Sequence, residues 1–192
     1  MLADLQAEAL VGTPDAVVLV EGLSDHFAVA TVASKLGRDL HEDGIAIVPM
    51  GGATNIGRFL AVFGPRGRNL RIAGLCDAAE AGYFARALER AGIDGRVGSA
   101  RVFVCDRDLE DELIRALGGS AVEAIIERAG ELSKLRSLQQ MPAHRDRPRD
   151  EHLHRFMGVR SARKYRYAQL LAEALPVDDI PRPLRTLVDS LG

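Results

Sequence analysis

The sequence predicts an α/β protein, with a four-stranded parallel sheet between helices and a C-terminal helical extension. Two observations lead to this fold class. Short apolar runs alternate with helix-like segments of about ten residues through the first two thirds of the chain, a pattern typical of βαβ units. After the fourth apolar run the strand-like patterns stop, and only helical ones follow.

Four strands are expected in the first two thirds of the chain. The first, Ala16–Val20, is an unbroken apolar run, which suits a strand buried on both faces of a parallel sheet. The others are expected at residues 45–48, 71–76 and 101–105, with helices between them at 25–36, 54–62 and 79–91.

The rest of the chain is expected to be helical. Helices are predicted at 108–117, 120–129, 151–157 and 161–175, followed by a short terminal helix after Pro183. Residues 141–150 combine two prolines with many charges, which indicates an exposed loop or linker. We therefore expect an α/β core at residues 1–132 and a basic helical extension at residues 133–192.

Composition limits the class of protein. With 192 residues, 47% of them hydrophobic, the chain can bury one proper core. No apolar run approaches the roughly 20 residues needed to cross a bilayer, and the first ten residues lack a basic signal region. Cys76 and Cys105 lie in strand-like segments without metal-ligand spacing, so we expect reduced thiols and a cytoplasmic protein.

Charge is distributed unevenly along the chain. Residues 1–133 hold 13 basic and 20 acidic residues, whereas residues 134–167 hold 10 basic and 3 acidic residues. An acidic core beside a basic segment suits a metal-dependent phosphodiester enzyme, because carboxylates bind cations and guanidinium groups bind phosphates. A solvated helical face would explain the same numbers.

Acidic residues follow the first and third expected strands. Glu21 and Asp25 come after the first strand, and Asp77 closes the third. Ligands of open α/β sheets collect at the carboxyl ends of strands, where converging carboxylates need cations such as Mg²⁺ or Mn²⁺ to stay ionised. The alternative is structural: Ser24 and Asp77 would cap helices, and Asp25 would favour a positive helix end.

Further carboxylates, Glu110 and Glu112, follow the fourth strand. They could reach the same edge of the sheet as the other acids and bind the same cations. A structural explanation is equally available here, because Asp108 as N-cap with Asp111 three residues later gives an acidic first turn that the helix dipole stabilises.

Lys164 stands in line with an apolar helical stripe. Its stem either extends from the first turn to solvent, or its ammonium group points at a phosphoryl group near the acids. Arg160, Arg163 and Arg166 would flank it as phosphate contacts. Gly51-Gly52 permits a tight turn or close approach to a ligand but matches no nucleotide-binding fingerprint, and none of the five histidines is assigned a role.

Together these motifs resemble a known domain. Val20-Glu21-Gly22 with Asp25, Gly51-Gly52, Asp77 and Asp108-Leu109-Glu110 resemble the Toprim domain, in particular that of the overcoming-lysogenisation-defect (OLD) family nucleases. Lys164, followed by Tyr167–Glu173, resembles that family's lysine-bearing C-terminal helix. The similarity extends from about Val17 to Ala174.

The resemblance implies a Toprim, Rossmann-like fold and a metal-dependent DNA endonuclease that nicks or cleaves phosphodiester bonds with two Mg²⁺ or Mn²⁺ ions. Glu21, Asp25, Asp77 and Glu110 would be metal ligands. Glu21 would also act as a general acid or base, and Lys164 would stabilise the transition state.

Two departures leave alternatives open. Toprim domains usually carry Asp-x-Asp after the third strand, but here the sequence is Asp77-Ala78-Ala79. Glu80 is one residue out of register, but from a helix start it could still reach the metal or bind it through water. The chain could therefore be a degenerate Toprim module that binds nucleic acid or an ATPase partner without catalysis. OLD nucleases also carry an ABC-type ATPase ahead of this domain, so we expect a separate ATPase subunit or a freestanding module. Nucleotidyl transfer and RNA hydrolysis are weaker options.

Overall fold

The computed structural model describes residues 1–93, 100–158 and 161–192. These residues form a four-stranded sheet in the order β2-β1-β3-β4, with every neighbouring pair parallel. The expected α/β fold is confirmed, and each strand lies within a residue of its predicted range: β1 (Ala16–Val20), β2 (Ile45–Pro49), β3 (Arg71–Asp77) and β4 (Ala100–Cys105).

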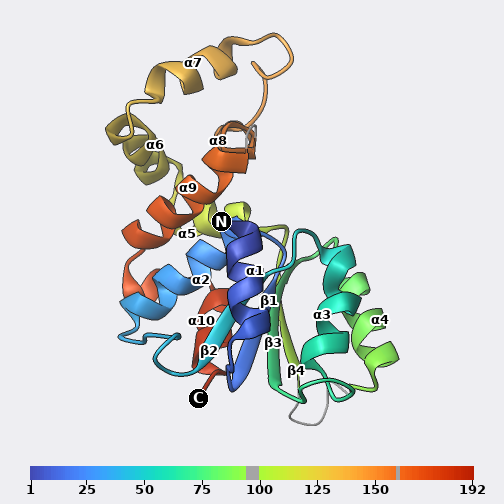
Figure 1. The fold of residues 1–192 in the computed structure, drawn as a ribbon. Coiled ribbons are helices and arrows are strands. Elements are labelled where there is room, and N and C mark those ends of the chain that lie inside the picture. The colour runs from blue at the N-terminus through green and yellow to red at the C-terminus, as the bar shows by residue number, and fades with distance from the viewer. Residues whose placement is uncertain (94–99, 159–160) are drawn as a thin grey trace.

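One face of the sheet is covered by α1 (Leu2–Val11), α3 (Ile56–Phe63) and α4 (Ala81–Ala91), with the turn η1 (Ala53–Asn55) leading into α3 (Figure 1). Side chains of β1 alternate between the two faces, and Val17 and Leu19 pack on this side against Phe59 and Phe63. Helix α1 was not predicted from the sequence.

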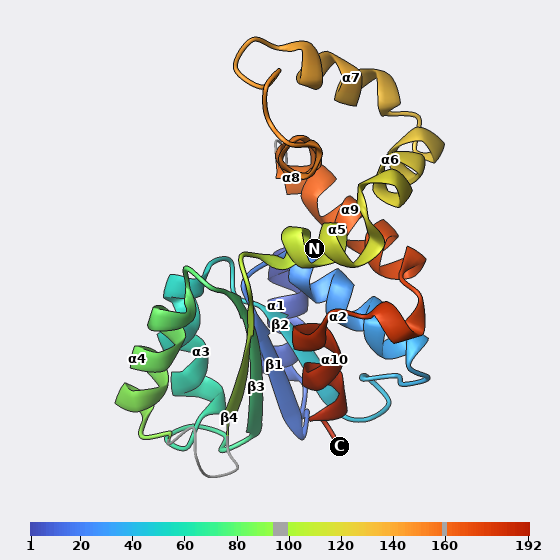
Figure 2. The ribbon, with the colours of Figure 1, turned by 180° about the vertical axis from the view of Figure 1, so that it is seen from behind.

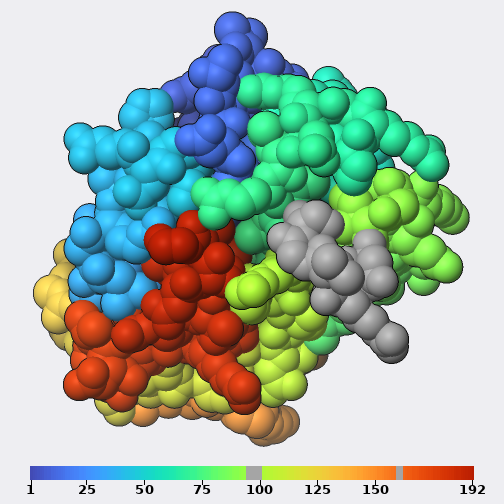
Figure 3. Space-filling view, turned by 90° about the horizontal axis from the view of Figure 1, so that it is seen from below, coloured from blue at the N-terminus to red at the C-terminus, as the bar shows by residue number. Residues whose placement is uncertain are grey.

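The other face is covered by α2 (Leu23–Lys35) and α10 (Arg182–Asp189), with α9 (Ser161–Ala174) packed on α2. Val18 and Val20 point to this side and join the larger core. Seen from below, α10 (red) lies between the blue segment that includes α2 and the yellow-green segment of β4 (Figure 3). The turn η2 (Val177–Asp179) connects α9 to α10.

Three helices extend beyond the carboxyl ends of the strands. Helix α5 (Leu109–Leu117) follows β4 and leads to α6 (Gly119–Arg128), α7 (Leu132–Gln140) and α8 (Arg149–Gly158), which rise away from the sheet (Figures 1 and 2). We call residues 119–158 the protruding helices. Helices α9 and α10 belong to the predicted helical extension at residues 133–192, but they return to the sheet side of the molecule. The division of the chain into a core and an extension at residue 133 stays a prediction.

Three further expectations can be compared with the structure. Cys76 and Cys105 are buried and free, as expected for reduced thiols. Of the helices in the described ranges, none combines the length and apolarity required to span a lipid bilayer. Residues 141–148 form exposed turns before α8, in agreement with the predicted loop.

Candidate metal centre at the carboxyl ends of the strands

Glu21 follows β1 directly and is fixed from two sides. The backbone N–H groups of Gly51 and Gly52 both donate to the Glu21 carbonyl at 2.9 Å. The two glycines have φ values of +77° and +121°, which other residues rarely adopt, so the loop after β2 can fold tightly over the end of β1. The Glu21 side chain accepts through Oε1 from the Asp77 N–H at 3.0 Å, which links the ends of β1 and β3.

Asp25 lies in the first turn of α2, and only 7% of its surface is exposed. Its Oδ2 accepts from the Gly22 N–H at 2.8 Å. The suggestion that Ser24 caps this helix is wrong, because the N-cap is Gly22 and no side chain caps it. Burial, together with the charges of Glu110 and Asp77, raises the pKa of Asp25 to about 7.

Asp77 ends β3, two residues before the exposed Ala79. The suggestion that Asp77 caps the following helix is also wrong, since the N-cap of α4 is Glu80. Burial and the nearby Glu21 charge raise the pKa of Asp77 to about 7. The Glu80 charge acts on Glu21 and helps to raise its pKa, although burial contributes more, so Glu80 lies near the rim despite its altered register.

Glu110 and Lys164 meet in space although 54 residues separate them in the sequence. Lys164 Nζ lies 3.1 Å from Glu110 Oε2. Glu110 is 97% buried, and its Oε1 has no hydrogen-bond partner in the described part of the chain. Burial raises the pKa of Glu110 despite the opposing Lys164 charge. Burial disfavours the Lys164 charge, but Glu110, Asp25 and Asp77 raise the pKa of this lysine.

The predicted carboxylates therefore share one electrostatic environment. Glu21, Asp25, Asp77 and Glu110 have raised pKa values, with burial as the first cause in each case and neighbouring acids as a further cause. Buried carboxylates that repel one another need a counter-charge, and Lys164 supplies only one. An unpartnered carboxylate oxygen in an oxygen-rich donor set fits a hard divalent cation.

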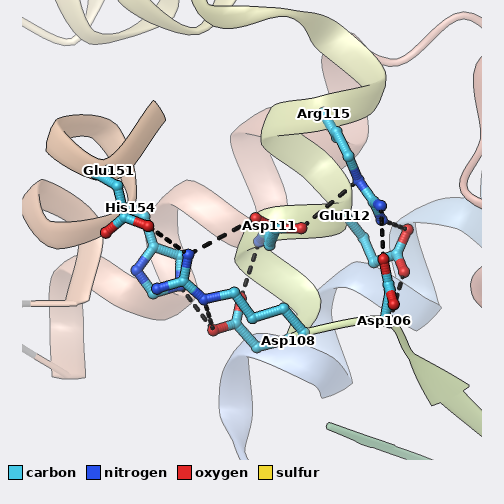
Figure 4. A network of polar contacts seen from close by, with 8 residues as sticks. Asp106, Asp108, Asp111, Glu112, Arg115, Glu151 and His154 are labelled. Carbon is cyan, nitrogen blue, oxygen red and sulfur yellow. Dashed lines mark hydrogen bonds and ion pairs between the residues drawn. The ribbon is translucent and has the colours of Figure 1, made fainter. Parts of the chain in front are cut away.

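Two residues that the sequence reading did not assign to the site lie beside Glu110. Asp108 caps α5, as the structural alternative predicted, by accepting from the Asp111 N–H at 2.9 Å. Its other oxygen lies 2.6 Å from His154 Nε2 on α8 (Figure 4). Ligand atoms of Asp108, Glu110 and His154 lie within 4.8 Å of one another. No local spacing could have shown this contact, because His154 comes from a separate helix.

Glu112 is less suited to the metal centre than Glu110. Its Oε1 accepts from the Asp106 N–H at 2.9 Å, and its Oε2 lies 2.8 Å from Arg115 Nη2. Figure 4 shows this group on the side of α5 away from His154. Both oxygens of Glu112 thus have partners, and its predicted metal role stays a prediction.

The predicted phosphate contacts lie around a different carboxylate. Arg163 Nη2 lies 3.1 Å from Glu131, and Arg166 lies 3.9 Å from it. Glu131 also accepts from the Tyr167 hydroxyl at 3.0 Å. Arg160 falls outside the described residues. A phosphate role for Arg163 would require it to share its guanidinium with Glu131, and this role stays a prediction.

The raised pKa of Asp25 gives a test of stability. Because its pKa in the folded protein, about 7, exceeds that of an unfolded aspartate, its contribution is fully present below about pH 4 and lost as pH rises through about 7. Without metal, Asp25→Asn should therefore be more stable than wild type at pH 8, by on the order of 2 kcal/mol. Urea unfolding at pH 4.5 and pH 8 measures this, with Asp146→Asn as the exposed control. Equal stability at pH 8 would contradict it.

Comparison with known proteins supports the fold and the resemblance of the sequence to a Toprim domain. Residues 14–78 match the model of the overcoming lysogenization defect protein-like TOPRIM domain. The C-terminal region of the Burkholderia pseudomallei OLD protein aligns with a TM-score of 0.67 and 26% identity, covering 93% of this chain and 96% of that one. A structure of the C-terminal region of the Xanthomonas campestris pv. campestris OLD protein aligns with a TM-score of 0.72 and 25% identity, covering 95% of this chain and 96% of that one. Among curated proteins no match is found.

The chain carries an OLD-like Toprim domain. The resemblance seen in the sequence is thereby confirmed, and an OLD-like Toprim domain suggests a nuclease-type role. The residues matched by the family model include Glu21, Asp25 and Asp77, whereas Glu110 and Lys164 lie beyond them.

Proposed function

We propose that this OLD-like Toprim protein is a metal-dependent DNA endonuclease that nicks or cleaves phosphodiester bonds. The observation that carries the proposal is the environment of Glu110: one oxygen faces the Lys164 ammonium at 3.1 Å, and the other is buried without a partner. A carboxylate in this state, beside acids with raised pKa values, is suited to cation binding.

Four residues would hold the metal: Glu21, Asp25, Asp77 and Glu110. Glu80, whose charge raises the pKa of Glu21, is a further candidate ligand. A pair of Mg²⁺ or Mn²⁺ ions bound there would supply an activated water and charge stabilisation for the departing oxygen. The Asp77 N–H fixes Glu21 Oε1, which leaves Oε2 to exchange a proton. The raised pKa of Glu21 suits a general acid or base, and Lys164 would stabilise charge on the phosphoryl group.

The protruding helices supply a surface for the nucleic-acid backbone. Arg145, Arg147 and Arg155 are exposed and form no ion pair with the described residues, unlike Arg136 and Arg149, which pair with Glu123. Cationic side chains on this surface would attract phosphates without reading sequence.

This surface leads to a prediction about salt. DNA affinity should fall steeply with rising salt, and Arg145→Gln with Arg147→Gln should lower the log–log slope by about one unit per lost phosphate contact. Fluorescence anisotropy with a labelled duplex at several salt concentrations measures the slope. Arg90→Gln on α4 is the matched control and should leave the slope unchanged. A wild-type slope near zero would mean that this surface does not contact phosphates.

The direct test of the proposed function is plasmid nicking. The purified protein should convert supercoiled DNA to relaxed circles when Mg²⁺ or Mn²⁺ is present, and EDTA should stop the reaction. If the protein nicks DNA neither with Mg²⁺ nor with Mn²⁺, the proposal is contradicted. A parallel assay on labelled RNA separates DNA cleavage from the RNA alternative.

A second candidate function rests on Ala79. This residue stands where Toprim domains usually have a second aspartate, so the chain could bind nucleic acid or a separate ATPase subunit without catalysis. We expect Ala79→Asp to change Mn²⁺ affinity by less than about threefold, because Glu80 already places a carboxylate near Glu21. Isothermal titration calorimetry measures this. A tenfold gain, accompanied by new nicking activity, would favour the degenerate module. Both candidates place the protein in the cytoplasm, where Cys76 and Cys105 would stay reduced.

A further inference from the structure

His154 brings a nitrogen atom from the protruding helices to the edge of the carboxylate rim. Ligand atoms of Asp108, Glu110 and His154 lie within 4.8 Å of one another. Within the described ranges, this is the one group of three or more His, Cys, Asp or Glu side chains that is compact enough to hold a metal ion. Asp108 and Glu110 stand at the start of α5. His154 comes from α8 and points toward Asp108 (Figure 4). The group therefore joins the Toprim core to a helix outside it.

The contacts around this group leave atoms available for an ion. Asp108 uses Oδ1 to cap α5, while Oδ2 lies 2.6 Å from His154 Nε2 and 4.0 Å from Arg107 Nε, so that an ion would share Oδ2 with the Arg107 guanidinium. Lys164 occupies Glu110 Oε2, so the buried and unpartnered Oε1 is the oxygen of Glu110 that lacks a positive neighbour. A buried carboxylate oxygen without a hydrogen bond is costly in a folded protein unless a cation or donor reaches it.

We propose that His154 is a metal ligand which, with Asp108 and Glu110, forms a mixed nitrogen–oxygen site that prefers Mn²⁺ to Mg²⁺. The ion takes the place of any proton on His154 Nε2, and the ring binds it as a neutral imidazole that carries its one proton on Nδ1; the Nε2 proton passes to Nδ1, or to solvent where Nδ1 is already protonated. Imidazole nitrogen suits transition ions, whereas Mg²⁺ keeps to oxygen ligands and water. This inference rests on the proposed function, because Glu110 also belongs to the proposed metal centre, and it adds a ligand from outside the Toprim core.

A different role for His154 would give some of the same effects. A histidine that only orients Asp108 also weakens metal binding when it is lost, typically 10- to 100-fold. The experiment must therefore detect nitrogen bound directly to the ion. Electron spin echo envelope modulation of bound Mn²⁺ does so, since a coordinated imidazole gives a ¹⁴N modulation that an oxygen ligand cannot give.

In the purified full chain loaded with Mn²⁺, we expect a ¹⁴N modulation that changes to the ¹⁵N pattern after ¹⁵N-histidine labelling. His154→Gln should lose the modulation and lower Mn²⁺ affinity at least tenfold, to about the level of an oxygen-only site, while Mg²⁺ affinity falls less than about threefold. His41→Gln, which replaces an exposed histidine between α2 and β2, should keep the modulation.

The outcomes are distinct from those of the nicking assay. Mn²⁺ binding by wild type without any histidine nitrogen signal, or an unchanged signal in His154→Gln, would overturn this inference even if the protein cuts DNA. A nitrogen signal in a protein that never cuts DNA would support His154 as a ligand and contradict the endonuclease. If His154→Gln does not fold, the isotope-labelled wild type and Asp108→Asn, which should lose the signal, still decide the question.

Discussion

Replacing Glu21 with glutamine should reduce plasmid nicking at least about 1000-fold at saturating metal. Glutamine keeps a carbonyl oxygen that can accept from the Asp77 N–H, so the link between β1 and β3 survives. What the variant loses is the negative charge needed to bind a cation and the group that exchanges a proton. The measurement is the initial rate of relaxed-circle formation from supercoiled DNA with Mn²⁺.

The matched control for this variant is Glu89→Gln, which removes an exposed carboxylate from α4 on the face of the sheet that carries α1 and α3. It should cut DNA at the wild-type rate. Circular dichroism and a thermal melt should show that both variants are folded. If Glu21→Gln nicks plasmid as fast as Glu89→Gln, then Glu21 has no part in the reaction, and the proposed centre is misassigned.

Replacing Lys164 with methionine should lower the nicking rate about 100-fold or more, with a smaller effect on DNA affinity. Methionine preserves the apolar stem that continues the buried stripe of Ala168 and Leu171, but it removes the ammonium 3.1 Å from Glu110. Stabilisation of charge that develops in the transition state would be lost, while binding of the ground state would change little. Single-turnover rates and anisotropy titrations separate the two effects.

Lys35→Met is the control for Lys164. Lys35 also contacts α9, donating to the Glu173 carbonyl at 2.8 Å, but it lies at the far end of α2 from Asp25. Loss of this contact should change stability slightly and leave the nicking rate unaltered. Equal loss of rate in both variants would mean that disturbed packing of α9, and not the Lys164 charge, limits the reaction.

Local patterns were sufficient to predict the sheet. Ala16–Val20 is apolar at every position and is buried at every position, so a strand buried on both faces of a parallel sheet could be predicted from this run alone. Helix α1 was missed because it adds only one fully buried residue, Ala9, to the core. Helix α7 was missed for the same reason, since Leu135 is its one fully buried residue.

The candidate site was predictable where the topology alone determines position. Glu21, Asp77 and Glu110 follow strands that point the same way, so their convergence needed only a parallel sheet. His154 could not be found in this way, because its contact with Asp108 depends on how α8 packs against α5. The same limit explains Arg163: its sequence neighbour Lys164 reaches the acids, whereas Arg163 itself contacts Glu131.

The central claim is that carboxylates from the ends of β1, β3 and β4 bind divalent cations together. A crystal structure of the protein soaked in Mn²⁺, with anomalous scattering used to locate the ions, tests it most directly. We predict at least one Mn²⁺ peak with oxygen ligands from Glu21, Asp77 or Asp25 and from Glu110. Peaks confined to other parts of the surface, or none at a Mn²⁺ concentration that supports nicking, would contradict the claim.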